Sequence, residues 1–243
     1  ENYSDLTPIR AKDILVFSVC AAAYERGWIN ITVNQIANAL TGYGSDRHVT
    51  PNLKEAILDS VKRLMCTRIT VDMSDTCEAL KNYRMKKSTL TDVLLPCKIY
   101  DNVKVNGQTA TVIVLRDESP LMQIAEAKNQ ILRINTALLQ IPEINDTPQN
   151  LTLKDYLVCR VLSIVKHKNL NDNITFSDLF SKCAISIADR FAERRIRKTI
   201  EVILSHLKAK GIISDFYFTM RNSFGKVVKY VFGNEYHGIK ITR

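Results

Sequence analysis

The sequence predicts a mainly helical α+β protein made of two units, each closed by a β-hairpin. In both halves of the chain, segments with one apolar helical face are followed by short segments typical of strands. Each half also has a turn signal between its last two strand-like segments, Asn106 with Gly107 in the first half and residues 222–225 in the second. The whole excess of positive over negative charge lies in the second half, so the two halves differ in chemistry.

The first half is expected to follow the order helix, short strand, helix, turn, helix, strand and hairpin. Thr7, Thr32 and Thr50 stand before the three helical patterns as N-caps. The hairpin serves either as a wing or as an extension of the sheet. In chain order the segments are 9–26, 28–31, 32–40, 41–48, 50–65, 68–73 and 98–115, with a short helix at 120–128 and a helical or extended run at 131–141.

The second half repeats this order after a polar stretch that has two prolines and no periodicity. We take that stretch, residues 142–150, as a linker between an N-terminal domain, 1–141, and a C-terminal domain, 151–243. This order of elements is that of a winged helix-turn-helix domain, so the sequence predicts two such domains in tandem. The second set of segments is 151–168, 173–175, 178–183, 184–188, 189–211 and 212–232, with an edge strand expected at 239–241.

The helix predicted at 189–211 has two chemically different faces. Asp189 suits its N-cap and Gly211 suits its end. One face is apolar and is expected to pack on the core, through Ile196, Ile200, Ile203, Leu204 and Leu207. The other is cationic near the N-terminal end and would read DNA in a major groove, through Arg190, Arg194, Arg195, Arg197 and Lys198. The simpler alternative is that these cations form only a solvated face.

The distribution of charge favours a polyanionic partner for the second half. Residues 1–146 contain 17 basic and 17 acidic side chains, whereas residues 147–243 contain 17 basic and 8 acidic ones, which accounts for the net charge of +9. Nucleic acid is the first partner expected of such a surface, and an anionic membrane is the second. The hairpin adds Arg221, Lys226 and Lys229, which would contact phosphates as a wing or are ordinary exposed strand residues.

The neutral first half is expected to play a lesser part in DNA binding. Its third helix mixes basic with acidic side chains, which suits contact with the DNA backbone or with another protein more than base reading. Arg47 in the preceding turn and Lys54 in that helix are the candidates for DNA contact. The absence of net charge also suits a homodimer contact or the binding of replisome proteins.

Signatures of catalysis, cofactors and metal sites are absent from the sequence. It has no phosphate-binding glycine motif and no nucleophile motif, its six cysteines lack zinc-site spacing and its four histidines are isolated. We therefore expect a binding protein without catalytic residues, metal or cofactor. Without a membrane-spanning run or signal peptide, it is expected in the cytoplasm. The chain starts at Glu1 instead of Met, as a fragment of a longer protein would.

The order of these parts resembles the plasmid-type replication initiators, the Rep proteins of the theta-replicating, iteron-binding class. Residues 152–162 (TLKDYLVCRVL) are similar to the helix that opens the second domain of those proteins, and the basic helix with residues 211–216 and 226–232 is similar to the later part of that domain. The stretch 94–121 is similar to proteins of plasmids and other mobile elements of Gram-positive bacteria. The resemblance implies tandem winged helices and a second-domain helix that reads repeated origin sites. The resemblance assigns the reading of these sites to Arg190, Arg194, Arg197 and Lys198.

The function expected from the sequence is specific binding of double-stranded DNA, either origin repeats or an operator. A replication initiator of a plasmid or mobile element is the first expectation. A transcriptional regulator on the same scaffold is an alternative, and the position of the bound site, beside an origin or at a promoter, separates the two. A replisome organiser or helicase-loading module is a further alternative, which the neutral first half favours.

Overall fold

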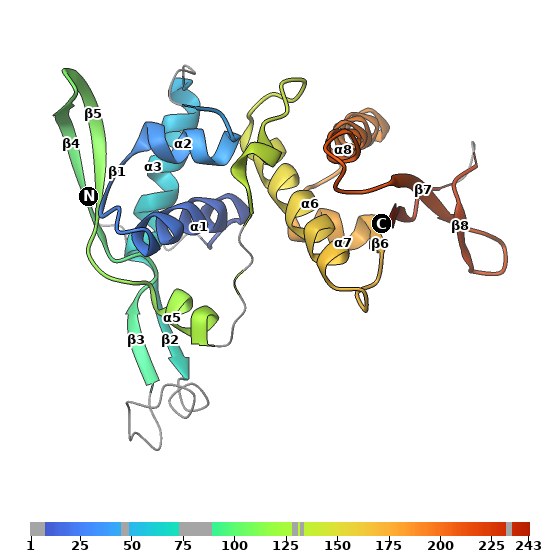
Figure 1. Cartoon of the computed structure of the whole chain (residues 1–243), viewed down its shortest axis with the longest axis horizontal. Helices are drawn as coiled ribbons and strands as arrows, with labels where there is room; N and C mark the ends of the chain where they lie inside the picture. Colours follow the sequence, from blue (N-terminus) through green and yellow to red (C-terminus); the bar gives the residue numbers. More distant parts are fainter. Residues whose placement is uncertain (1–7, 45–48, 73–88, 128–130, 132–133, 232–234) are drawn as a thin grey trace. The chain divides into compact units, whose positions relative to one another are not determined.

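The chain folds as two compact units, Glu1–Arg133 and Ile134–Arg243, which we call unit 1 and unit 2 (Figure 1). The computed structural model describes residues 8–44, 49–72, 89–127, 131, 134–231 and 235–243. These residues contain seven α-helices, one 3-10 helix and three β-sheets. The α+β class predicted from the sequence is therefore confirmed.

Unit 1 begins with three helices, and two of their predicted N-caps are confirmed. The helices span Ala11–Glu25 (α1), Val33–Thr41 (α2) and Pro51–Cys66 (α3). The Thr32 hydroxyl oxygen accepts the N–H of Gln35 at 3.1 Å, and the Thr50 hydroxyl oxygen accepts the N–H of Leu53 at 3.4 Å. These short polar side chains satisfy N–H groups that have no partner within the helix, so α2 and α3 begin where the sequence predicts.

Asp13 determines both the start of α1 and its packing on α3. Its carboxylate accepts the backbone N–H of Arg10 at 2.8 Å, so α1 begins at the next residue, two positions later than predicted. The same buried carboxylate accepts bonds from the Arg63 guanidinium, at 2.8 and 2.9 Å, and from the Ser60 hydroxyl. Burial opposes ionisation, but these bonds outweigh it and lower the pKa of Asp13. The predicted cap Thr7 lies outside the described residues.

Unit 1 contains two antiparallel sheets. Its strands are Asn30–Thr32 (β1), Arg68–Asp72 (β2), Thr89–Val93 (β3), Cys97–Val105 (β4) and Gln108–Leu115 (β5), and the helix α5 follows at Pro120–Ala127. One sheet has the order β1-β5-β4, and the other pairs β2 with β3. Asn106 and Gly107 form the predicted turn, with φ of 48° and 79°, the positive values that a two-residue hairpin turn requires. Because β5 also pairs with β1, this hairpin extends the sheet.

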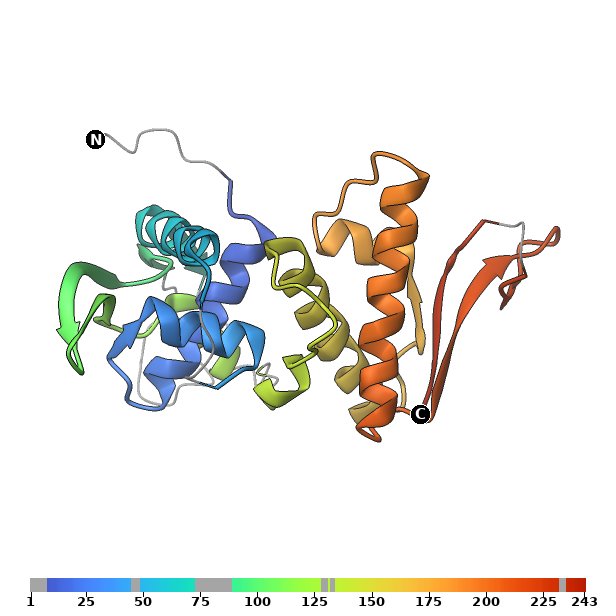
Figure 2. The same cartoon turned by 90° about the horizontal axis from the view of Figure 1, so that it is seen from above.

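Unit 2 combines three α-helices with one four-stranded sheet among its described residues (Figure 2). Its helices are Thr136–Leu139 (η1, a 3-10 helix), Pro148–Lys166 (α6), Phe176–Lys182 (α7) and Arg190–Ala209 (α8). Its strands are Asn173–Thr175 (β6), Asp215–Arg221 (β7), Val227–Lys229 (β8) and Gly238–Thr242 (β9). Helices α6 and α8 lie side by side and share the hydrophobic core. None of the described helices of either unit is long and apolar enough to cross a membrane.

The segment predicted as a linker, 142–150, is instead packed into unit 2. The division between the units falls before it, after residue 133, and Ile144 belongs to the core of unit 2. The fully buried Lys154 of α6 holds the segment, because its ammonium donates to the Leu139 carbonyl at 3.2 Å and to the Asp146 carboxylate at 2.9 Å. Asp146, one of the polar residues that suggested a linker, is thus the acidic partner in a buried ion pair.

Strand β9 lies inside the sheet and not at its edge, where it was predicted. The strand order is β6-β9-β7-β8, so β9 pairs with both β6 and β7. Its two isoleucines, Ile239 and Ile241, are buried. Gly238 runs so close to β6 that a Cβ atom there would lie 2.4 Å from the Ile174 carbonyl oxygen. Glycine is therefore the residue that lets β9 enter between its neighbours.

Lys154→Ala is expected to destabilise unit 2 by about 3 kcal/mol, because the Asp146 carboxylate would lose its buried counter-ion. Equilibrium unfolding in urea measures the change. Lys166→Ala removes an exposed charge from the same helix and serves as the control, with an expected change below about 0.5 kcal/mol. Equal effects of the two substitutions would contradict the packing of residues 139–146 on α6.

Asp155 is expected to make the stability of unit 2 depend on pH. Burial raises its pKa to about 6, although a hydrogen bond from the Cys159 thiol acts in the opposite direction. Because the folded pKa lies above the unfolded value of about 3.9, stability is greatest below that value and falls as the pH rises to about 6. Asp155→Asn should remove this fall and raise the free energy of unfolding at neutral pH by about 2 kcal/mol. Urea unfolding between about pH 4 and pH 7 tests this, and an unchanged pH profile would refute it.

Candidate nucleic-acid interface

Helix α8 presents its cationic face outward because its opposite face is held in the core. The Asp189 carboxylate accepts the N–H of Ala192 at 2.7 Å, which confirms the predicted N-cap. The predicted apolar stripe is half-buried at Ile196 and completely buried further along, at Ile200, Ile203, Leu204 and Leu207. Rotation of the helix about its axis would expose this stripe, so the core determines which side chains face solvent.

Four of the five cations predicted on α8 are exposed: Arg190, Arg194, Arg195 and Lys198. Phe191 is 76% exposed and, from its spacing, shares one face with Arg194, Arg195 and Lys198. Among the described residues, no carboxylate forms an ion pair with any of these cations. We call Phe191, Arg194, Arg195 and Lys198 the outer face of α8. Phe191 was not predicted as a site residue, because an apolar side chain in a helix is ordinarily expected in the core.

Arg197 was predicted among the DNA-reading cations, but its guanidinium turns toward the protein. Its Nη1 donates to the Glu193 carboxylate at 3.0 Å, one helical turn away. Its guanidinium carbon lies 3.9 Å from the centre of the Tyr236 ring. A stacked, paired arginine of this kind connects α8 to the chain that leads into β9. Its contacts therefore position α8 and hold the guanidinium away from the outer face.

An aromatic cluster continues the contact from Tyr236 across unit 2. Tyr236 stacks on Tyr230, with ring centres 3.7 Å apart, and meets Phe218 edge-on at 5.6 Å. Phe218 lies 6.1 Å from Phe176, which stacks on Phe180 at 5.4 Å. These five rings join α7, β7 and the chain on both sides of residues 232–234. With Arg197 above Tyr236, the cluster links α8 to the base of the β7–β8 hairpin.

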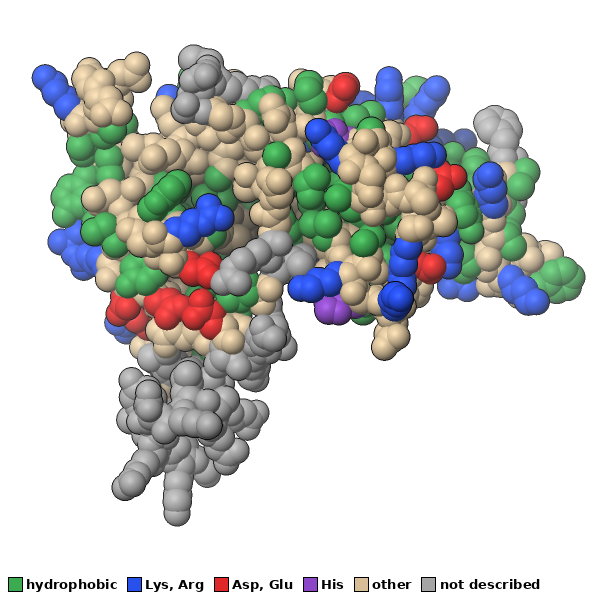
Figure 3. Space-filling model, viewed as in Figure 1, with side chains coloured by type: hydrophobic (Ala, Val, Ile, Leu, Met, Phe, Trp, Pro, Cys, Tyr) green, Lys and Arg blue, Asp and Glu red, His purple; other side chains and the backbone are tan. Residues whose placement is uncertain are grey.

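The β7–β8 hairpin carries the other predicted cations of unit 2. Arg221, Lys226 and Lys229 are all exposed, and Lys229 Nζ lies 5.8 Å from the centre of the Tyr217 ring. Lys and Arg side chains are visible along this hairpin in Figure 3. Figure 1 shows the hairpin extending away from the helices of unit 2. Phe224, in the turn, is 87% exposed and was not predicted as a site residue.

Of the two cations predicted to contact DNA in unit 1, the structure describes only Lys54. Arg47 lies outside the described residues, and Lys54 is half-buried in the first turn of α3. Arg63, on the same helix, forms an ion pair with the buried carboxylate of Asp13. The contacts of Arg47 and Lys54 with DNA therefore stay predictions.

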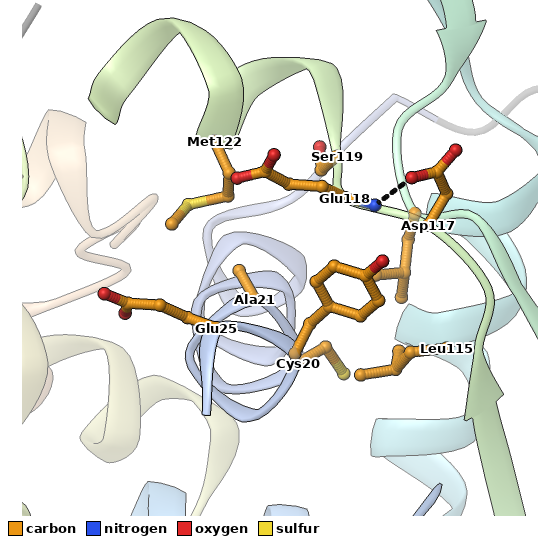
Figure 4. A pocket seen from close by; sticks show the side chains of 10 residues that line it. Cys20, Ala21, Glu25, Leu115, Asp117, Glu118, Ser119 and Met122 are labelled. Carbon is orange, nitrogen blue, oxygen red and sulfur yellow. Dashed lines mark hydrogen bonds between the residues drawn. The ribbon is translucent and has the colours of Figure 1, made fainter. Parts of the chain in front are cut away.

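Unit 1 instead carries an acidic patch, formed by Glu25, Asp117, Glu118 and Glu126, near α5 (Figure 3). Burial, followed by repulsion from the other three carboxylates, raises the pKa of Glu118. Glu25, Asp117 and Glu118 also line a shallow pocket with Met122, as Figure 4 shows. These four carboxylates make this part of the described surface of unit 1 acidic.

The described residues contain no group of three or more His, Cys, Asp or Glu side chains placed to hold a metal ion. The five described cysteines are free thiols. Burial raises the pKa of Cys20, Cys97, Cys159 and Cys183, which makes these thiols poor nucleophiles.

Comparison with known proteins gave a structural likeness but no match in sequence. No model of a protein family matches the chain, and no curated protein sequence matches it. Among solved structures, the chain is similar to the crystal structure of selenomethionine derivatives of domains 2 and 3 of RctB. The two are 13% identical, the match covers 97% of this chain and 83% of the other, and the TM-score is 0.44. A likeness this distant carries no argument about function.

Arg197→Lys is expected to lower the stability of unit 2 by about 1 kcal/mol, because an ammonium keeps the charge but loses the planar stack on Tyr236. Urea unfolding measures the loss, and near-ultraviolet circular dichroism reports the stacked tyrosines. Arg194→Lys, at an exposed position of the same helix, is the matched control and should leave both signals unchanged. If the two variants behave alike, Arg197 does not position α8.

Proposed function

We propose that unit 2 is a winged helix-turn-helix domain that binds double-stranded DNA, with α8 in the major groove and the β7–β8 hairpin as its wing. The observation that carries this proposal is the outer face of α8, where three cations and an exposed phenyl ring lie together. Exposed cations of this kind can neutralise phosphates or bond to base edges. The alternative is that these cations form only a solvated face. An exposed phenyl ring among them is not expected of such a face, so Phe191 favours a contact surface.

The order and pairing of the elements support the same proposal. Unit 2 runs α6, β6, α7, α8, hairpin and β9, and β9 closes the sheet by pairing with β6 and β7. Unit 1 runs α1, β1, α2 and α3 before its β4–β5 hairpin, and β5 pairs with β1. Both are orders in which the third helix precedes a hairpin, as in winged-helix domains. We therefore propose two winged-helix domains in tandem.

The chemistry of the outer face suggests how bases would be read. The guanidinium groups of Arg194 and Arg195 can each donate two bonds to the O6 and N7 atoms of guanine. The Phe191 ring can contact the methyl group of thymine, an apolar feature of the major groove. Lys226 and Lys229 would bond to phosphates of the adjoining backbone and set the register of α8 on the duplex. Binding should therefore weaken steeply as salt is added.

We propose a role in replication initiation on a plasmid or mobile element, following the resemblance to the iteron-binding initiators. A transcriptional regulator on the same scaffold is the alternative, since both functions need sequence-specific binding. In either role the chain acts in the cytoplasm as a binding protein and not as an enzyme. Its acidic patch and small net charge, with 17 basic and 15 acidic side chains in residues 1–133, suit unit 1 for contact with a second copy or with replisome proteins. The position of the bound sequence, beside an origin or at a promoter, separates the two roles.

Arg194→Ala combined with Lys198→Ala is expected to reduce specific duplex binding by at least about 30-fold at fixed salt, because it removes a base contact and a phosphate contact. The bound sequence is first enriched from random duplexes with the unaltered protein, and a gel-shift titration then compares the variants. Thermal unfolding checks that both residues, which are exposed, can be replaced without loss of the fold.

The matched control is Lys166→Ala combined with Lys210→Ala, which removes the same net charge from exposed positions away from the outer face. It should reduce affinity by less than about threefold, since distant charges are screened by salt. If both double variants lose the same affinity, net charge and not the outer face determines binding. If no duplex is enriched above background, DNA binding by unit 2 is ruled out.

A further inference from the structure

We infer that Phe224, at the tip of the β7–β8 hairpin, is a wedge that inserts between base pairs in the minor groove beside the site read by α8. This inference rests on the proposed function, because it needs a duplex bound to unit 2. Phe224 is 87% exposed, the largest exposed fraction among the large apolar side chains that the structure describes. Burying a phenyl ring stabilises a complex, so a ring displayed to solvent is a ready contact for a partner.

The turn that carries Phe224 is braced by several hydrogen bonds. The Asn222 side-chain oxygen accepts the backbone N–H groups of Phe224, at 3.1 Å, and of Lys226, at 2.9 Å. The Arg221 guanidinium donates to the Gly225 carbonyl at 3.2 Å, and Gly225 has a φ of 74°, in the region that favours glycine. The turn therefore holds the ring outward without the cost of ordering a loose loop upon binding.

The charge around the ring favours a nucleic acid as the partner. Between Asp215 and Glu235 the sequence contains no acidic residue, and Arg221, Lys226 and Lys229 are exposed along the hairpin. DNA suits both features at once, because it is a polyanion whose stacked base faces offer an apolar surface to an inserted ring. An acidic protein surface with an apolar pocket would be the competing partner, and measurements on a bound duplex distinguish the two.

The proposed role of the hairpin as the wing of α8 favours the minor groove. Because major and minor grooves alternate along a duplex, a wing beside a helix in the major groove faces the backbone and the minor groove beyond it. Phenylalanine is one of the side chains that enter a base step from the minor groove, unstack it and bend the duplex. Pyrimidine–purine steps unstack most easily, so we expect one such step on the hairpin side of the α8 site.

The experiment compares Phe224→Ala, Phe224→Trp and Lys226→Ala in the full chain on the duplex enriched with the unaltered protein. Affinity is titrated at several salt concentrations, bending is followed by energy transfer between dyes on the duplex ends, and 2-aminopurine at successive steps reports unstacking. Phe224→Ala should lose about tenfold in affinity, the bend and the 2-aminopurine signal, with an unchanged salt slope. Lys226→Ala should keep the signal and lower the salt slope by about 1. Phe224→Trp should retain the affinity, the bend and the 2-aminopurine signal.

The matched control is Val165→Ala, which trims an exposed apolar side chain of α6 and should change nothing. If the unaltered protein binds its duplex and Phe224→Ala binds and bends it equally well, the wedge is overturned while DNA binding by unit 2 stands. If Phe224→Ala instead loses self-association or a protein partner, with the duplex complex unchanged, the ring is a protein contact and the wedge is likewise overturned. Failure of the unaltered protein to bind any duplex rejects the proposed function itself.

Discussion

The stack of Arg197 on Tyr236 is the contact that connects the surface helix of unit 2 with its sheet. It joins α8, whose outer face is cationic, to the chain that leads into β9. The aromatic cluster extends that connection to α7 and β7. One cation of α8 is thus directed toward the protein, while the buried apolar stripe holds the helix on the core. The contact also offsets part of the repulsion among the cations of α8, because Glu193 and a ring face lie against the Arg197 guanidinium.

The two units have similar orders of elements but different ways of handling charge. In unit 1 the buried carboxylate of Asp13 forms an ion pair with Arg63, and in unit 2 the buried ammonium of Lys154 forms one with Asp146. Each pair joins an N-terminal part of its unit to a long helix. The charges left at the surface differ: four carboxylates gather on unit 1, whereas exposed cations line α8 and the hairpin of unit 2. Under the proposed function, this asymmetry assigns DNA contact to unit 2 and leaves unit 1 for contact with proteins.

Local patterns in the sequence predicted most of the elements but few of the contacts between them. Thr32, Thr50 and Asp189 act on N–H groups three residues away, so their effect is visible in a short stretch of sequence. Lys154 and Tyr236 act on residues brought near by the fold, and no periodicity announces such partners. Phe191 and Phe224 were passed over for a different reason. Composition predicts that phenylalanine is buried, and only the structure tells an exposed ring from a core one.

The insertion of β9 between β6 and β7 affects how unit 2 acquires its shape. The β7–β8 hairpin can close by itself, but β6 has no strand beside it until a segment more than sixty residues later arrives, with Asn173 pairing Lys240. Closing so distant a contact is slow and is rewarded only when the whole sheet is complete. The sheet of unit 2 can therefore be completed only after β9 has been made, although α8 can pack on α6 before that.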